Sequence, residues 1–289
     1  MIGFLKNSRA GRFFKRKPLV PVVRMTGVIG AVTPLRPGLT LAGVADPLER
    51  AFSLAKEAVA IQINSPGGSA VQSRLIFQRI RDLARENEVR VYTFAEDVAA
   101  SGGYMIACAG DEIYADPSSV VGSIGVLYTG FGFDKLIGKL GIERRVHTAG
   151  ERKMSLDAFQ PENSDDIDRL KNIQRIIHQE FIDLVVNSRG QKIEDHKDNL
   201  FTGEFWSGRQ ALELGLIDGL TDVRAKMREL YGDDVRLKLV STERGLLRRR
   251  TPGVALGLDA LTGGAGMSGL TEEAISAIEA RALWNRFGF

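Results

Sequence analysis

A serine followed by two glycines constrains the fold of this chain more than any other feature. Ser101-Gly102-Gly103 lies between an extended apolar run at 89–94 and a short helix-compatible segment at 104–109. A strand, a sharp turn at small residues and then a helix can lift a side-chain oxygen clear of the backbone. The first free N–H groups of the helix then point at whatever that oxygen attacks. The pattern therefore indicates that Ser101 is a nucleophile.

A second turn of this kind comes earlier in the chain. A short apolar strand predicted at 58–63 runs into Asn64-Ser65-Pro66-Gly67-Gly68, and an amphipathic helix is predicted at 71–85. Further strands are expected at 22–29 and 112–115. This alternation of strands and helices predicts an α/β fold with a mostly parallel sheet flanked by helices.

The two turns are expected to meet, because neighbouring parallel strands end at the same edge of a sheet. Glycines there permit unusual φ values and let a substrate approach the backbone closely. The N–H of Gly67 or Gly68, together with the N–H of Gly102, can thus form an oxyanion hole that stabilises the transition state of acyl transfer. The alternative interpretation is a strand-ending turn without a catalytic role.

A serine hydroxyl also needs a base that takes its proton. The chain has three histidines, His147, His178 and His196, and none of them lies in a catalytic motif. A lysine can replace histidine where an apolar, water-poor setting keeps the amine uncharged. Lys153 is a candidate, because the apolar residues that follow it can supply such a setting; the alternative is an ordinary surface lysine.

Charge is distributed unevenly along the 289 residues. Eight of the 39 Lys and Arg residues and none of the 36 Asp and Glu residues precede position 46, so the remainder has 31 basic against 36 acidic residues. A basic arm on an acidic body does not indicate a nucleic-acid-binding domain; it is compatible with an arm that contacts anionic lipid and equally with a solvated tail. The single cysteine, Cys108, allows no intramolecular disulfide and no cysteine-based metal site. We expect no metal and no cofactor.

Composition divides the chain into three parts. We expect a basic N-terminal arm at 1–17, one catalytic domain at 18–241, and a basic, glycine-rich appendage at 242–289 that ends in an amphipathic helix at 271–287. We find no run of about 18 apolar residues, so the sequence does not predict a transmembrane helix. We also find no apolar h-region of the kind that marks a cleaved secretory signal. Helices are also expected at 46–58, 133–140, 165–188, 207–214 and 223–231, and strands at 143–148 and 236–240.

Several motifs occur in a characteristic order. NSPGG is followed by a helix, a strand and SGGYMIA, then by DEIYADPSSVVGSIGV, and Lys153 lies 52 residues after Ser101 (153 − 101). Together they closely resemble the signal peptide peptidase A (SppA) family, the serine-lysine proteases with a ClpP/crotonase-like fold. The resemblance runs from about Val22 to Val240 and includes FTGEFWSGRQALELGLIDGL at 201–220.

The resemblance implies a role for each matching residue. Ser101 is the expected nucleophile and Lys153 the general base. Ser123, in the GSIG motif, is expected to orient the lysine amine, and Gly68 and Gly102 are expected to supply the oxyanion N–H groups. The segment around the lysine reads GERKMSLDAF, so its match rests on spacing, with Lys135 and Lys139 as weaker alternatives.

The resemblance also implies partners and a location. Half-length bacterial members of the family form closed rings in which the serine and the lysine of one site come from neighbouring subunits. Their substrates are remnant signal peptides and other hydrophobic, unfolded chain segments. Many members carry an N-terminal transmembrane anchor, which we do not find in this sequence. We therefore expect a homo-oligomer in the cytoplasm or peripherally bound at a bacterial inner membrane.

Two other functions are compatible with the same fold. A crotonase-type acyl-CoA enzyme also holds an oxyanion with paired backbone N–H groups, but such enzymes generally rely on carboxylate acid/base residues. A non-catalytic scaffold would keep the ring without activity. The joint presence of Ser101, Ser123 and Lys153 favours the protease over both.

Overall fold

The computed structural model describes residues 17–30, 38–150, 152–241, 277–278 and 280–289. Most of the predicted basic arm and the glycine-rich stretch of the predicted appendage lie outside these residues. None of the helices in the described part of the chain combines the length and the apolar character that a bilayer crossing requires.

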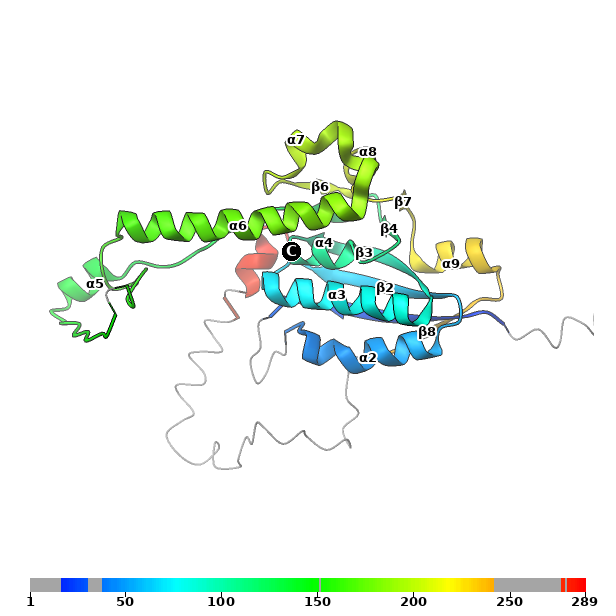
Figure 1. Ribbon diagram of the computed structural model, residues 1–289, viewed down its shortest axis with the longest axis horizontal. Coiled ribbons are helices and arrows are strands. Elements are labelled where there is room, and N and C mark those ends of the chain that lie inside the picture. The colour runs from blue at the N-terminus through cyan, green and yellow to red at the C-terminus, as the bar shows by residue number, and fades with distance from the viewer. Residues whose placement is uncertain (1–16, 31–37, 151, 242–276, 279) are drawn as a thin grey trace, which may run out of the picture.

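An eight-stranded sheet forms the centre of the molecule (Figure 1). Its strands run in the order β6-β5-β3-β2-β1-β8, with β4 beside β3 and β7 beside β4. All pairs are parallel except β5 and β6. The strands are β1 (Leu19–Thr26), β2 (Ala58–Ser65), β3 (Arg90–Ala100), β4 (Glu112–Ala115), β5 (Val120–Gly122), β6 (Phe205–Ser207), β7 (Gly219–Leu220) and β8 (Arg236–Leu239).

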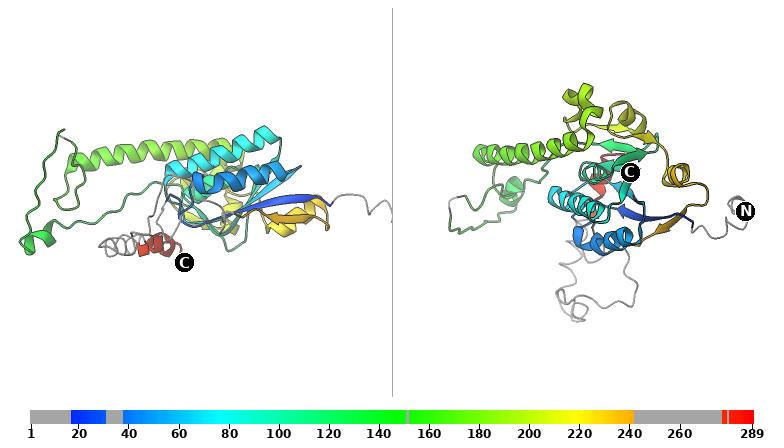
Figure 2. Two further views of the ribbon diagram at one scale, coloured as in Figure 1. Left: turned by 90° about the horizontal axis from the view of Figure 1, so that it is seen from below. Right: turned by 45° about the vertical axis from the view of Figure 1, so that its right-hand side comes forward.

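Helices cover both faces of the sheet, and side chains alternate between two cores. The helices α2, α3, α4 and α6 pack on one face, where Val23 and Ile61 belong to the larger core. The helix α9 packs on the opposite face, where Met227 meets Val22 and Tyr92 (Figure 2). The expected mostly parallel α/β fold is confirmed. The helices are α2 (Leu41–Leu54), α3 (Ala70–Asn87), α4 (Gly102–Ala107), α5 (Asp134–Lys139), α6 (Ser164–Arg189), the 3₁₀ helix η1 (Gly190–His196), α7 (Lys197–Leu200), α8 (Gly208–Glu213) and α9 (Val223–Tyr231).

Most predicted elements form, but three expectations were wrong in position or in type. The first strand ends at Thr26, because Gly27 turns the chain with a φ of 111°. The first helix begins at Leu41, where the Thr40 side chain accepts a hydrogen bond from the Gly43 N–H. The segment at 143–148, predicted as a strand, forms none, since no described strand lies beside it.

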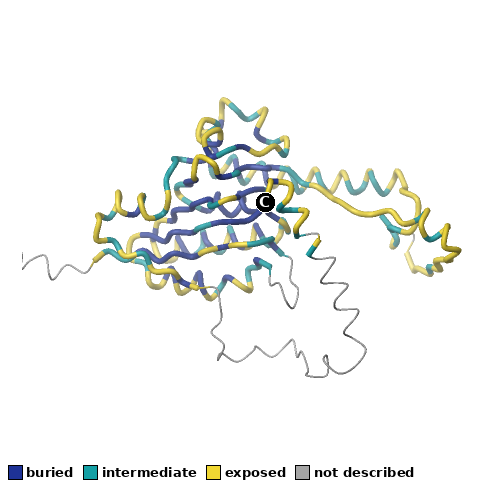
Figure 3. Tube along the Cα trace, turned by 180° about the vertical axis from the view of Figure 1, so that it is seen from behind, coloured by how far each residue is buried: buried dark blue, intermediate teal, exposed yellow. Residues whose placement is uncertain are grey.

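One long excursion leaves this body. The chain runs outward after Ile124, forms α5, and returns along α6, whose N-terminal half projects with it (Figures 1 and 2). We call residues 126–163 the arm; this segment is distinct from the predicted basic arm at 1–17. Its outgoing and returning stretches are joined by the hydrogen bond from Phe133 N to Ala158 O, at 2.6 Å. Much of its surface is exposed (Figure 3), including many large apolar side chains.

Candidate active site

The backbone of Ser101 is strained and held on both sides. Ser101 lies between β3 and α4 with φ 52° and ψ −121°, a conformation that costs a non-glycine residue on the order of 1–3 kcal/mol. Its N–H donates to the Gly122 carbonyl at 2.7 Å, and its carbonyl accepts from the Met105 N–H at 3.0 Å. The side chain makes no capping hydrogen bond to α4. The turn therefore fixes the backbone and leaves the hydroxyl available for chemistry.

Two glycine N–H groups lie beside this serine. Gly68, Ser101 and Gly102 line one cavity of about 180 Å³. Gly102 is the first residue of α4, so its N–H has no acceptor within the helix. The turn after β2 is bound to Ile29 through the carbonyl of Gly67 and the N–H of Ser69, which leaves the N–H of Gly68 outside that pairing. The structure thus brings together the predicted nucleophile and both predicted oxyanion donors.

Close packing explains why glycine occupies these positions. A Cβ added at Gly68, whose φ is 140°, would overlap the carbonyl oxygen of Ile29. A Cβ at Gly102 would overlap the hydroxyl of Ser73 on α3. Neither position accepts a side chain without displacing its neighbour, so both turns require glycine.

Ser123 directly follows β5, the strand that accepts a hydrogen bond from the Ser101 N–H. Because Ala100 pairs with Gly122, Ser123 follows the residue whose carbonyl accepts from Ser101. Ser123 is buried, has a φ of 54°, and donates its N–H to the Glu204 carbonyl at 2.7 Å. The GSIG motif is therefore held beside the serine turn.

His178 supports this motif from α6. Its Nε2 lies 3.1 Å from the Ile124 carbonyl oxygen, and since a carbonyl can only accept, Nε2 carries the proton. Sequence analysis gave His178 no role, because no motif surrounds it. The one available signal was its place on the helix predicted at 165–188.

The predicted base is not beside the nucleophile within one chain. Lys153 lies exposed in a turn of the arm, where its N–H donates to the Gly150 carbonyl, and it does not line the cavity of Ser101. The weaker candidates Lys135 and Lys139 are exposed on α5 of the same arm. The other two histidines do not line the Ser101 cavity either: His147 is exposed on the arm, and His196 lies in η1.

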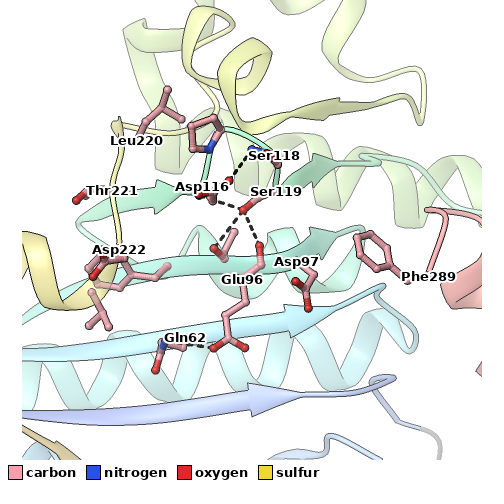
Figure 4. Close-up of a pocket in the computed structure, with 14 residues that line it drawn as sticks. Gln62, Glu96, Asp97, Asp116, Ser118, Ser119, Leu220, Thr221, Asp222 and Phe289 are labelled. Atoms are coloured by element: carbon pink, nitrogen blue, oxygen red, sulfur yellow. Dashed lines mark hydrogen bonds between the residues drawn. The ribbon is translucent and has the colours of Figure 1, made fainter.

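A larger cavity of about 590 Å³ is a different kind of site (Figure 4). Its carboxylates are already engaged within the fold. Glu96 accepts from Arg24 and Gln62, Asp97 accepts from Asn64 at 2.6 Å, and Asp222 caps α9. Nor do His, Cys, Asp and Glu side chains gather in threes that could hold a metal ion anywhere in the described ranges.

The sheet is mostly parallel and flanked by helices, and a strained serine turn follows the carboxyl end of its strand β3. This arrangement places the chain in the class of ClpP/crotonase-like proteins. Within that class it belongs to peptidase family S49, whose family model matches residues 84–234. A putative protease of Synechocystis sp. is 30% identical over 202 residues, which cover 68% of this chain and 72% of that protein. The putative signal peptide peptidase SppA of Enterococcus faecium is 30% identical over 167 residues, which cover 57% of this chain and 47% of that protein.

A further relative matches almost the whole chain. It is a Brucella abortus protein named Na(+)/H(+) antiporter NhaA, 52% identical over 288 residues, which cover 99% of this chain but 39% of that protein. The chain therefore spans about two fifths of that relative's length, and the name describes the larger protein. Family membership supports a peptidase.

Proposed function

We propose that this chain is a serine endopeptidase in which Ser101 of one copy is activated by Lys153 of a neighbouring copy. Its substrates are remnant signal peptides and other hydrophobic, unfolded segments. The observation that carries the proposal is an incomplete site: Ser101, Gly68 and Gly102 share a cavity, while the candidate base lies on a projecting arm.

The reaction follows from these positions. The uncharged amine of Lys153 takes the proton of the Ser101 hydroxyl as its oxygen attacks the peptide carbonyl. The N–H groups of Gly68 and Gly102 stabilise the resulting oxyanion. Collapse of this intermediate breaks the C–N bond, and the protonated Lys153 returns the proton to the leaving amine. Water then hydrolyses the acyl-enzyme, and the same lysine acts as the base. Ser123 orients the amine of this lysine in both steps.

Sharing the site between copies also explains how the lysine becomes a base. A lysine amine acts as a base most readily where apolar contacts exclude water, and Lys153 is exposed in one chain. A second chain packed on the arm supplies that setting.

The surface of the arm favours such packing. The arm exposes a series of large apolar side chains, and exposed apolar surface of this kind marks protein–protein contacts. Ile173 and Ile176 continue it on the projecting half of α6. The exposed apolar residues of the arm are Leu127, Tyr128, Phe131, Phe133, Leu136, Leu140, Ile142 and Phe159. We therefore assign the arm to contact with a second copy in a closed ring.

Mass spectrometry tests the nucleophile. A fluorophosphonate probe should leave a covalent adduct on Ser101 of the wild-type protein, and the Lys153→Ala variant should react far more slowly. A crotonase-type acyl-CoA enzyme would not be phosphonylated at Ser101, and an inactive scaffold would hydrolyse no peptide. Either result would refute the protease.

Mixed oligomers test the sharing of the site. Ser101→Ala and Lys153→Ala should each abolish hydrolysis while the oligomer stays intact. Co-assembled in equal amounts, they should recover about a quarter of the wild-type activity, since half of the sites keep the serine and half of those meet an intact lysine. A mixture that stays inactive would show that both residues act within one chain or that the dyad is misassigned. Separately purified variants mixed after assembly are the control.

A further inference from the structure

The end of the chain forms one wall of the candidate active site. Of the residues that line the Ser101 cavity, three come from the C-terminal segment at 280–289: Leu283, Arg286 and Phe287. Helix α6 contributes Ile177 and Phe181 to the same cavity. The C-terminal segment lies beside the sheet in Figure 1, where it is coloured red.

This segment is anchored to the domain. Phe287 is 8% exposed and packs in one cluster with Val98 and Ala100, the latter directly preceding the nucleophile. Its ring also meets that of Phe205 edge to face, with centroids 5.1 Å apart. Aromatic packing of this kind adds stability beyond that of the buried area alone. The segment is thus part of the site's architecture.

Arg286 gives the cavity its only charge among the described lining residues. The other lining residues are apolar or small, apart from Ser101. Arg286 is exposed at the cavity and forms no ion pair with any described carboxylate; its guanidinium lies 5.7 Å from the centre of the Phe287 ring. A guanidinium without a partner beside an apolar pocket can bind a carboxylate with two parallel hydrogen bonds.

The size of the cavity limits what enters it. At about 180 Å³ it is smaller than the roughly 300–1,000 Å³ of pockets that hold whole small-molecule ligands. It can take one residue of a peptide at a time. A carboxylate carried by that residue, or by the end of the peptide, would come within reach of Arg286.

We propose that Arg286 is a specificity-determining residue that selects peptides carrying a carboxylate next to the bond cleaved at Ser101. The inference rests on the proposed protease function. The carboxylate is either an acidic side chain or the free α-carboxylate of a peptide end, and both present the same group to the guanidinium.

The test compares matched peptides. Fluorogenic peptides identical except for Glu, Gln or Lys at each position beside the scissile bond measure side-chain selection, and free-acid against amidated peptides measure selection of the end. The wild-type protein should cleave the better carboxylate peptide about five- to tenfold faster, in kcat/KM, than its neutral counterpart. A dependence on Glu identifies the side chain as the source, and a dependence on the free acid identifies the end.

Charge variants decide the role of Arg286. Arg286→Gln should remove the preference, Arg286→Lys should retain part of it, and Arg286→Glu should turn it toward the Lys peptide. The matched control is Arg281→Ala, because Arg281 is exposed on the same segment and does not line the cavity. Equal selectivity in the wild-type protein and all Arg286 variants would overturn the inference. If the proposed protease function is wrong, the result is different: no peptide is hydrolysed and no probe adduct forms on Ser101.

Discussion

Gly67 packs against Ser101 so closely that a Cβ added at Gly67 would lie 2.7 Å from the Cβ of Ser101. The same atom would lie 3.0 Å from both the carbonyl oxygen of Ala100 and the nitrogen of Gly102. Gly67 also has a φ of 101°, which disfavours any side chain. The turn after β2 and the turn after β3 are therefore fitted to each other through this one position.

This contact predicts that Gly67→Ala impairs catalysis more than stability. The added methyl group must displace Ser101 or the N–H of Gly102, the predicted oxyanion donor that follows it. Loss of one oxyanion donor typically costs about 2.7–4 kcal/mol of transition-state stabilisation, so kcat should fall roughly 10²- to 10³-fold. Steady-state kinetics on a neutral peptide measure the effect.

Gly232→Ala is the matched control for this substitution. Gly232 ends α9 with a φ of 86°, yet a Cβ there would meet nothing within 4 Å. It shares the backbone strain without the contact to the site. Equal loss of kcat in the two variants would show that strain alone explains the defect.

The residues around Ser101 could be predicted because local sequence determines them. Small residues directly after apolar strands predict turns, and parallel strands bring those turns to one edge of the sheet. Gly102 and the alternatives Gly67 and Gly68 were identified on this basis, and the structure places Gly68 and Gly102 at the cavity of Ser101. Local pattern and tertiary arrangement agree at this edge.

Features that depend on distant contacts could not be predicted in the same way. The segment at 143–148 forms no strand, because β-structure needs a neighbour and the arm offers none among the described residues. Helical periodicity at 271–287 did not show where the segment docks, so the contribution of Phe287 to the cavity was missed. The pairing of Lys153 with Ser101 stays a prediction, since a single chain does not contain the contact.

His178 should act as a positioning residue. His178→Ala removes the donor to the Ile124 carbonyl, so the GSIG motif beside Ser101 loses its support from α6. A neutral hydrogen bond contributes about 0.5–1.5 kcal/mol, and we expect kcat to fall up to about tenfold with little change in KM. His178→Gln, whose amide can donate to the same carbonyl, should restore part of kcat. His196→Ala is the control, and a similar loss there, or no rescue by glutamine, would contradict this role.

The ion pair of Arg189 with Asp218 should make stability depend on acid pH. The side chain of Arg189 is 2% exposed and binds both carboxylate oxygens of Asp218, at 2.8 and 3.0 Å. Burial opposes ionisation of Asp218, but hydrogen bonds and charge from Arg189 and Lys192, with the Ile113 N–H, hold its pKa below the ordinary value. The stabilisation is therefore complete above the unfolded-state pKa of about 3.9 and is lost as the pH falls through the lower folded-state pKa.

Asp218→Asn tests this dependence. It leaves a buried guanidinium without a counter-charge, so the free energy of unfolding at pH 7 should fall by about 3–5 kcal/mol. Denaturant unfolding at a series of pH values should show the difference from wild type shrinking as the pH falls below about 4, toward the lower folded-state pKa of Asp218. Asp234→Asn is the control, because the pair of Lys17 with Asp234 is exposed and should contribute at most about 1 kcal/mol. A pH-independent difference for Asp218→Asn would contradict the assignment.

Cys108 should be chemically inert in the native protein. It is 3% exposed behind α4, and burial raises the pKa of its thiol to about 11, against the opposing charge of Arg189. Since the thiolate is the reactive form, reaction with a disulfide reagent at pH 8 should be at least about 100-fold slower than for an unfolded chain, whose thiol has a pKa of about 8.5. Protein unfolded in guanidinium chloride supplies the reference rate. Rapid modification of the native protein would show that α4 opens readily, and with it the turn that holds Ser101.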